Sequence, residues 1–276
     1  MKPILEVKNL NVDLKLGKNI SKIVRDSSFE VYPGECLGIL GESGSGKSMT
    51  VKSILGLLDK HFTVSGEARF NGRDLLLEKG ETLRRMRGKE ISMVLQNPMT
   101  CFDPLFRIGD QIRETFRTHT ELGRKEIYGR SIEILELMRI RNPEEVMRKY
   151  PHQLSGGMLQ RVMIGIAVAM QPSLIIADEP TTAIDAITQK EILDEFIRIK
   201  GEYNTAMIFI SHDLGAISRV ADRIIVMNKG RVVDRGTFRQ IVDEAKDPYT
   251  RLLIEKRKAV MSQYIRVLGN KEVEYA

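Results

Sequence analysis

The sequence has few cysteines and no long hydrophobic run, and each scarcity argues against a class of protein. Cys36 and Cys101 are the only cysteines and have neither CxxC nor metal-type spacing, so a disulfide framework is not expected and a reducing compartment is indicated. The most apolar run, Val162 to Met170, is less than half of the roughly 20 residues that a membrane-spanning helix needs. The N-terminus shows no signal-peptide pattern. We therefore expect a protein that is cytosolic or peripherally attached to a membrane.

The sequence also lacks a basic tail of the nucleic-acid-binding kind. Its net charge of +6 is spread along 276 residues, apart from the run Lys256-Arg257-Lys258. The simplest interpretation of this run is a solvated surface, and proximity to anionic lipid headgroups or to acidic partner loops is the alternative. No nucleic-acid partner is expected. The length and a hydrophobic content of 42% are those of one large domain with a core, with room for a helical insertion.

The pattern of apolar residues predicts an α/β fold with a parallel sheet. Apolar and polar residues roughly alternate from Leu5 to Leu14, and Asn71-Gly72 is a hairpin signal, so the first third predicts an antiparallel β subdomain. Four short runs are apolar without alternation, as in strands buried on both faces: Cys36–Leu40, Ile91–Leu95, Leu174–Ala177 and Met207–Ile210. Helical spacing between Pro104 and Tyr150 predicts an inserted helical subdomain.

A phosphate-binding loop follows the first of these apolar runs. The string matching GxxxxGK[ST] consists of Gly41, Glu42, Ser43, Gly44, Ser45, Gly46, Lys47 and Ser48. A strand precedes it and a helix, predicted over Met49 to Leu58, follows it, which makes a chance glycine-rich turn a poor alternative. Backbone N–H groups of such a loop bind phosphate oxygens, Lys47 would neutralise the β- and γ-phosphates, and the Ser48 hydroxyl would bind Mg²⁺. The sequence therefore predicts ATP and Mg²⁺ as ligands.

A second acidic motif ends the third apolar run. The strand predicted at Leu174–Ala177 would deliver Asp178 to Mg²⁺, and Glu179 would project toward the γ-phosphate and activate the attacking water. Taken alone, the pair could equally be acidic turn residues before Pro180. The phosphate-binding loop upstream favours the catalytic interpretation.

The segment Leu154-Ser155-Gly156-Gly157-Met158-Leu159-Gln160-Arg161 predicts another anion-binding helix start, although a serine-capped helix would look the same in isolation. The complete LSGGxxQR string resembles the signature motif of ATP-binding cassette (ABC) ATPases, and the resemblance extends from Leu5 to about Tyr249. A P-loop NTPase core with an antiparallel β subdomain and a helical subdomain is the fold it implies.

The resemblance implies a role for several further residues. Glu179, His212 and Gln96 would be catalytic, and Ser48, Gln96 and Asp178 would hold Mg²⁺. Two further nucleotide contacts would be Met49, which follows the phosphate-binding loop, and Leu14, at the position where the family stacks an aromatic on adenine. The signature motif would contribute Ser155, Gly156, Gly157 and Gln160, and the D-loop motif would contribute Asp185. Leucine at position 14 departs from the family pattern, because it cannot stack on the base as an aromatic does.

The resemblance also implies boundaries and partners. An ABC ATPase domain would span residues 1–255, with a nucleotide-binding core in 1–97 and 156–236, a helical subdomain at about 98–155, and a C-terminal helical tail at 237–276. Partners would be a second ABC ATPase subunit of a different chain, two membrane permease subunits and an extracytoplasmic solute-binding protein, at the cytoplasmic face of the cell membrane.

Strings such as Gln96-Asn97-Pro98 and Asp247-Pro248-Tyr249-Thr250 are similar to the peptide/nickel import group, most of all to its nickel-import ATPase. Nickel or a nickel chelate is the expected solute, and oligopeptides or dipeptides are the alternative. No cysteine follows Cys101, so no iron–sulfur cluster is expected.

Two other classes of protein are more distant alternatives. One is a soluble ABC protein of translation or DNA repair, against which the single cassette argues. The other is an unrelated P-loop kinase, against which the signature string argues.

Overall fold

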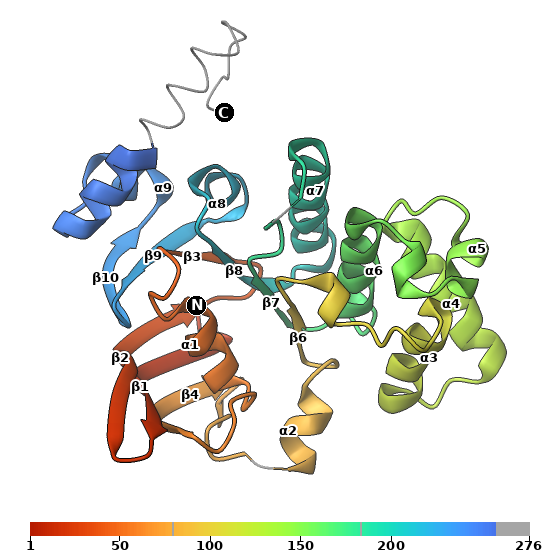
Figure 1. The fold of residues 1–276 in the computed structure, drawn as a ribbon, viewed down its shortest axis with the longest axis horizontal. Coiled ribbons are helices and arrows are strands. Elements are labelled where there is room, and N and C mark those ends of the chain that lie inside the picture. Colours follow the sequence, from red (N-terminus) through yellow and green to blue (C-terminus); the bar gives the residue numbers. More distant parts are fainter. Residues whose placement is uncertain (79, 183, 258–276) are drawn as a thin grey trace, which may run out of the picture.

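The computed structural model describes residues 1–78, 80–182 and 184–257, and in this part of the chain the strands form an antiparallel sheet and a mostly parallel one (Figure 1). The antiparallel sheet has the order β2-β1-β4-β5 and comprises β1 (Leu5–Leu16), β2 (Asn19–Val31), β4 (Phe62–Phe70) and β5 (Arg73–Asp74). The second sheet has the order β10-β9-β3-β8-β7-β6 and comprises β3 (Cys36–Leu40), β6 (Ile91–Val94), β7 (Leu174–Asp178), β8 (Ala206–Ser211), β9 (Arg223–Asn228) and β10 (Arg231–Gly236).

The parallel strands are buried on both faces, as their continuous apolar runs predict. Successive side chains point to opposite faces of a strand, so β8 sends Met207 and Phe209 to one hydrophobic cluster and Ile208 and Ile210 to another. We call the first cluster the helix-side core, because helices α6 (Gly156–Val168), α7 (Ala186–Tyr203) and α8 (Leu214–Val220) complete it. We call the second the sheet-side core, because the antiparallel sheet and α1 (Lys47–Ile54) complete it.

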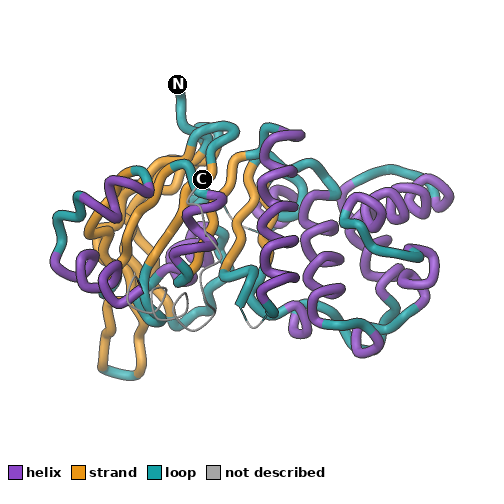
Figure 2. The backbone as a smooth tube through the Cα atoms, turned by 90° about the horizontal axis from the view of Figure 1, so that it is seen from above, coloured by secondary structure: helices purple, strands orange, loops and turns teal. Residues whose placement is uncertain are grey.

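The predicted helical segment lies between β6 and the signature string. It contains α3 (Ile108–His119), α4 (Arg124–Leu137), α5 (Pro143–Arg148) and the short turns η1 (Pro98–Thr100) and η2 (Pro151–Gln153). These helices contact one another, and α4 also packs against α6. Seen from above, they gather with α6 at one end of the molecule, away from the antiparallel sheet (Figure 2). The remaining helices of the described residues are α2 (Glu81–Met86) and α9 (Phe238–Asp243), and residues 248–257 are also helical.

Element boundaries differ from the predicted ones at a few positions. Helix α1 ends at Ile54 rather than at Leu58, because Gly56 adopts a left-handed φ of 61° that closes the helix. Strand β6 ends one residue before Leu95. The predicted hairpin at Asn71-Gly72 is confirmed, and β9 and β10 form a second antiparallel hairpin. Among the described residues, no helix combines the length and the apolar character needed to cross a membrane.

Candidate nucleotide-binding and hydrolysis site

The predicted catalytic and metal-binding residues lie at the carboxyl ends of adjacent parallel strands or in the segments that follow them. Strands β3, β8, β7 and β6 are neighbours, so the segments that follow them meet at one edge of the sheet. The phosphate-binding loop follows β3, Asp178 ends β7, Gln96 follows β6, and His212 follows β8. A cavity of about 520 Å³ lies there, a volume typical of small-molecule sites. It is lined by Glu42, Ser43, Gly44, Gly46, Lys47, Ser48, Met49, Gln96, Glu179, Thr182, His212 and Arg257.

The phosphate-binding loop has the backbone conformation that its glycines permit. Gly44 and Gly46 have φ of 79° and 101°, in the left-handed region that glycine adopts without steric cost. The buried ammonium of Lys47 donates hydrogen bonds to the carbonyl oxygens of Gly41 at 2.8 Å and Glu42 at 3.0 Å. Lys47 therefore extends back along its own loop, and its positive charge lies beside the loop carbonyls at the cavity.

Four side chains converge on the carboxylate of Glu179. Its Oε2 accepts hydrogen bonds from Gln96 Nε2 at 3.2 Å and Thr182 Oγ1 at 3.0 Å, and lies 3.1 Å from His212 Nδ1. Lys47 Nζ lies 3.7 Å from Oε1. The backbone of Glu179 has a φ of 48°, a left-handed conformation that is uncommon for a non-glycine residue, and its N–H donates to the Ile210 carbonyl on β8. The structure thus fixes this carboxylate beside the phosphate-binding loop.

Asp178 and Ser48 form the second polar pair of the site. The Ser48 hydroxyl donates to Asp178 Oδ1 at 2.6 Å, and the Asp178 side chain is buried. Burial raises the pKa of Asp178, and the hydrogen bond from Ser48 opposes that rise. Burial lowers the pKa of Lys47, while the negative charges of Glu179 and Asp178 oppose that change. The Ser48 hydroxyl, the Asp178 carboxylate and the amide oxygen of Gln96, which lines the same cavity as Ser48, are the hard oxygen donors that Mg²⁺ prefers, so the donor set fits this ion.

The signature residues lie apart from this cavity and contribute no lining atoms to it. Ser155 is the N-cap of α6, and its Oγ accepts from the Met158 N–H at 3.3 Å. Ser155 and Gly156 are exposed, and no atom lies within 4 Å of a Cβ built on Gly156. The turn therefore presents an open helix start to the solvent rather than to the chain's own phosphate-binding loop.

Several predicted nucleotide contacts lie elsewhere. Gln160 is fully buried in α6, and neither atom of its amide has a hydrogen-bond partner, so its placement does not support a nucleotide contact. Leu14 is half-buried on β1 and is not among the cavity-lining residues. Exposed Asp185 caps α7, where Oδ1 accepts from the N–H groups of Ile187 and Thr188. Within the phosphate-binding loop, Gly41 and Ser45 are buried and do not line the cavity. The string that resembles the D-loop is Ala183-Ile184-Asp185, and Ala183 lies outside the described residues.

Sequence reasoning missed two cavity-lining residues. Thr182 orients Glu179, yet nothing in the string Pro180-Thr181-Thr182 distinguishes its hydroxyl from that of Thr181, and only the turn after Glu179 does so. Arg257 belongs to the basic run for which a solvated surface was the simplest interpretation, and the structure instead places it at the cavity. Lys258, the last residue of that run, lies outside the described residues.

Together the fold and the site define a P-loop nucleotide-hydrolase architecture that carries a helical subdomain. Residues 24–182 match the ABC transporter family. The chain is 43% identical over 246 residues to a metal-staphylopine import system ATP-binding protein of Staphylococcus aureus, covering 89% of this chain and 91% of that one. It is 40% identical over 250 residues to the oligopeptide transport ATP-binding protein OppD of Haemophilus influenzae, covering 91% and 77%.

A solved structure supports the same assignment. The chain resembles a dimeric post-hydrolysis structure of the ATP-binding cassette MJ0796 bound to ADP and Pi, with a TM-score of 0.77 and 26% identity, over 85% of this chain and 99% of that one. The chain therefore belongs to the ABC transporter family, as an ATP-hydrolysing subunit.

Proposed function

We propose that ATP binds in the cavity at the phosphate-binding loop, with its phosphates held by Gly41 to Met49. The left-handed glycines let successive N–H groups of the loop face one anion, and the helix dipole of α1 adds to their field. Lys47 gives up its contacts with the loop carbonyls and binds the β- and γ-phosphates instead. Mg²⁺, held by Ser48, Asp178 and Gln96, neutralises phosphate charge when bound.

We propose that Glu179 is the catalytic carboxylate, and the convergence of polar groups on it is the observation that carries this proposal. Thr182 and Gln96 hold one carboxylate oxygen by hydrogen bonds, so the carboxylate can orient a water molecule and accept its proton. The His212 ring on the same oxygen completes this end of the cavity, where the terminal phosphate would lie. Phosphoryl transfer depends mainly on such positioning and charge stabilisation.

We propose that Ser155, Gly156 and Gly157 bind a nucleotide held by a second ATPase subunit. The exposure of Ser155 and Gly156 and the absence of side chains at the two glycines support this role, because an incoming phosphate can approach the helix start closely. Asp185, exposed at the start of α7, would lie in the same subunit interface. Closure of the two subunits would move the helical subdomain, residues 98–155, with the signature turn.

We infer that the chain powers an importer of nickel or a nickel chelate. The identity to a metal-staphylopine import protein supports this solute. The peptide-transport relatives, 40–43% identical, support oligopeptides or dipeptides as the alternative. The partners would be a different ATPase chain, two permease subunits and a solute-binding protein, with this chain peripheral at the cytoplasmic face.

The test is hydrolysis by the complete complex, purified from membranes in mild detergent and reconstituted with its solute-binding protein. Nickel–histidine is expected to stimulate phosphate release several-fold, because solute loading favours the closed ATPase dimer. Oligopeptides of mixed sequence should leave the rate at its basal value. Stimulation by peptide and not by nickel–histidine would replace the metal assignment with the peptide one. Failure to purify with multi-span partners would contradict the importer role itself.

A further inference from the structure

The C-terminal helical residues 248–257 contact the phosphate-binding loop. The Tyr249 hydroxyl accepts a hydrogen bond from the Glu42 N–H at 3.0 Å, although the two residues are 207 positions apart. Lys256 Nζ lies 4.0 Å from the Glu42 carboxylate. Both ends of the segment therefore reach the same residue at the start of the loop.

The segment is held in place independently of these two contacts. Leu253 and Ile254 are buried in the helix-side core. The start of the segment is capped, because Asp247 accepts from the Tyr249 N–H at 2.8 Å and its own N–H donates to Asp234 of β10 at 3.0 Å. The segment is thus a packed part of the domain, and its last described residues have a defined position beside the cavity.

Arg257 is one of the residues that line the cavity, and it directly follows Lys256, whose Nζ lies near the Glu42 carboxylate. This is the end at which Glu179 lies, because Lys47 Nζ is 3.0 Å from the Glu42 carbonyl oxygen and 3.7 Å from the Glu179 carboxylate. Ser48, whose hydroxyl pairs with Asp178 and which is proposed to hold Mg²⁺, also lines the cavity. The helical segment therefore brings a guanidinium to the end of the cavity where the last phosphate of a nucleoside triphosphate would lie.

We propose that Arg257 binds the terminal phosphate of ATP, and that Tyr249 positions the helix that carries it. The inference rests on the proposed binding of ATP in this cavity. A guanidinium is always charged, and its planar set of N–H donors matches phosphate oxygens. Because ADP lacks the γ-phosphate, Arg257 favours binding of the triphosphate over that of the diphosphate.

The test is calorimetric titration of the full-length chain with ADP and with a non-hydrolysable ATP analogue, both with Mg²⁺. Arg257→Gln is expected to weaken analogue binding about fivefold to tenfold, as for a charged hydrogen bond that is partly exposed, and to change ADP binding less than about twofold. Arg239→Gln is the matched control, since it removes the same charge from a side chain that is 90% exposed and does not line the cavity. It should change neither affinity by more than about twofold.

Equal weakening of both nucleotides in Arg257→Gln, equal effects of the two variants, or an unchanged preference for the triphosphate would overturn the inference. The variant Lys47→Ala distinguishes a failure of the inference about Arg257 from a failure of the proposed nucleotide site. If Lys47→Ala loses both nucleotides while Arg257→Gln keeps the wild-type preference, only the inference about Arg257 fails. If Lys47→Ala binds both as the wild type does, the proposed nucleotide site is wrong, and the inference fails with it.

Discussion

Glu179 is the residue on which most polar contacts of the site converge. A carboxylate held by Gln96, Thr182 and Lys47 has little freedom to rotate, so its orientation is set before substrate binds. The left-handed backbone conformation of Glu179 also costs conformational free energy, which the surrounding structure must offset. Such features are typical of groups whose position matters for a reaction.

Replacing Glu179 by glutamine should separate ATP binding from hydrolysis. Glu179→Gln keeps the side chain's shape and one acceptor oxygen, but it replaces the other oxygen by an NH2 donor and cannot accept a proton from water, so turnover should fall about 10²- to 10⁴-fold. ATP affinity should not weaken, because the change removes a negative charge from beside the phosphates. Phosphate release measures the turnover of this variant, and nucleotide titration of the same preparation measures its ATP affinity.

Glu133→Gln provides the control for this substitution. Glu133 lies on α4 in an exposed ion pair with Arg130. Its replacement should leave turnover and ATP affinity within about twofold of the wild type. Turnover of Glu179→Gln within about threefold of the wild type would contradict the catalytic role, since it would correspond to less than 1 kcal/mol of transition-state stabilisation.

At the scale of elements, the turn between β9 and β10 connects the phosphate-binding loop to the antiparallel sheet. The Gly230 N–H donates to the Ser45 carbonyl at 2.9 Å. The Gly230 carbonyl accepts from the Arg25 N–H at 2.8 Å and from the Ser27 hydroxyl at 3.1 Å, both on β2. The position of the loop therefore depends on a turn that is remote in sequence.

Gly230→Ala should destabilise the protein more than Gly72→Ala does. Both glycines are left-handed, with φ of 81° and 86°, so both variants incur a backbone cost of about 1–2 kcal/mol. A Cβ at Gly230 would lie 2.3 Å from the Ile23 carbonyl oxygen, whereas a Cβ at Gly72 meets nothing within 4 Å. Overpacking should add about 1–3 kcal/mol at Gly230 alone.

Urea unfolding of the two variants measures this difference directly. Gly230→Ala should also weaken nucleotide binding, because its backbone must shift beneath Ser45, and Gly72→Ala should not. Equal losses of unfolding free energy in the two variants would show that the β9–β10 turn can move without cost, contrary to the tight contact with β2.

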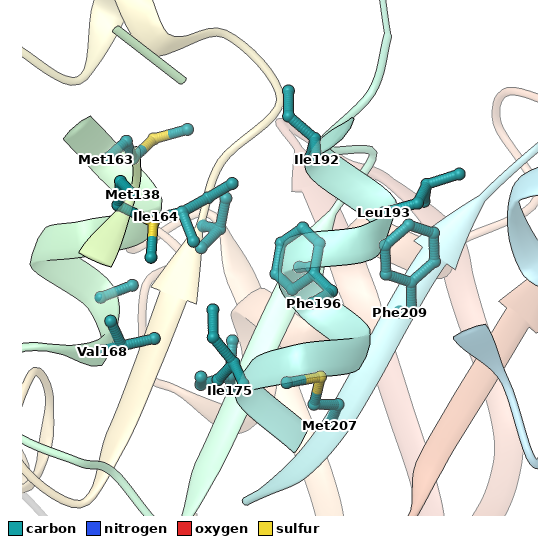
Figure 3. Close-up of a cluster of buried hydrophobic side chains, with 14 of the residues drawn as sticks. Met138, Met163, Ile164, Val168, Ile175, Ile192, Leu193, Phe196, Met207 and Phe209 are labelled. Atoms are coloured by element: carbon teal, nitrogen blue, oxygen red, sulfur yellow. The ribbon is translucent and has the colours of Figure 1, made fainter. Parts of the chain in front are cut away.

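At the scale of the whole molecule, one sheet separates two cores. The helix-side core contains an edge-on pair of aromatic rings, Phe196 and Phe209, with centroids 5.6 Å apart (Figure 3). The sheet-side core contains Phe70 on β4. Strands β3, β7 and β8 contribute side chains to both, so loss of either core exposes the sheet that supports the other.

Substitutions in the two cores should therefore shift one common unfolding transition. Phe209→Ala and Phe70→Ala should each lower the free energy of unfolding by about 3–5 kcal/mol, and far-ultraviolet circular dichroism and tyrosine fluorescence should report the same midpoint in urea. Phe106→Ala, at a side chain that is 54% exposed, should change the free energy of unfolding by less than about 0.5 kcal/mol. Two separate transitions would show that the antiparallel sheet with α1 unfolds independently.

The sequence by itself determined the parts that depend on neighbouring residues. Burial of a parallel strand on both faces requires an unbroken apolar run, and a phosphate-binding loop requires glycines at fixed spacing, so β3, β7, β8 and the loop at Gly41 to Ser48 could be predicted. The end of α1 was misplaced because the apolar pattern continues past Ile54, although the backbone turns at Gly56.

Only the tertiary structure decided which distant side chains meet. The contacts of Glu179 with Gln96 and His212, and of Glu42 with Tyr249, join segments whose separation is set by how helices and sheets pack. The burial of Gln160 has the same origin, because the face of α6 that turns inward depends on its neighbours in the helix-side core. Local patterns encode strands and turns, whereas these contacts arise from packing that brings remote parts of the chain together.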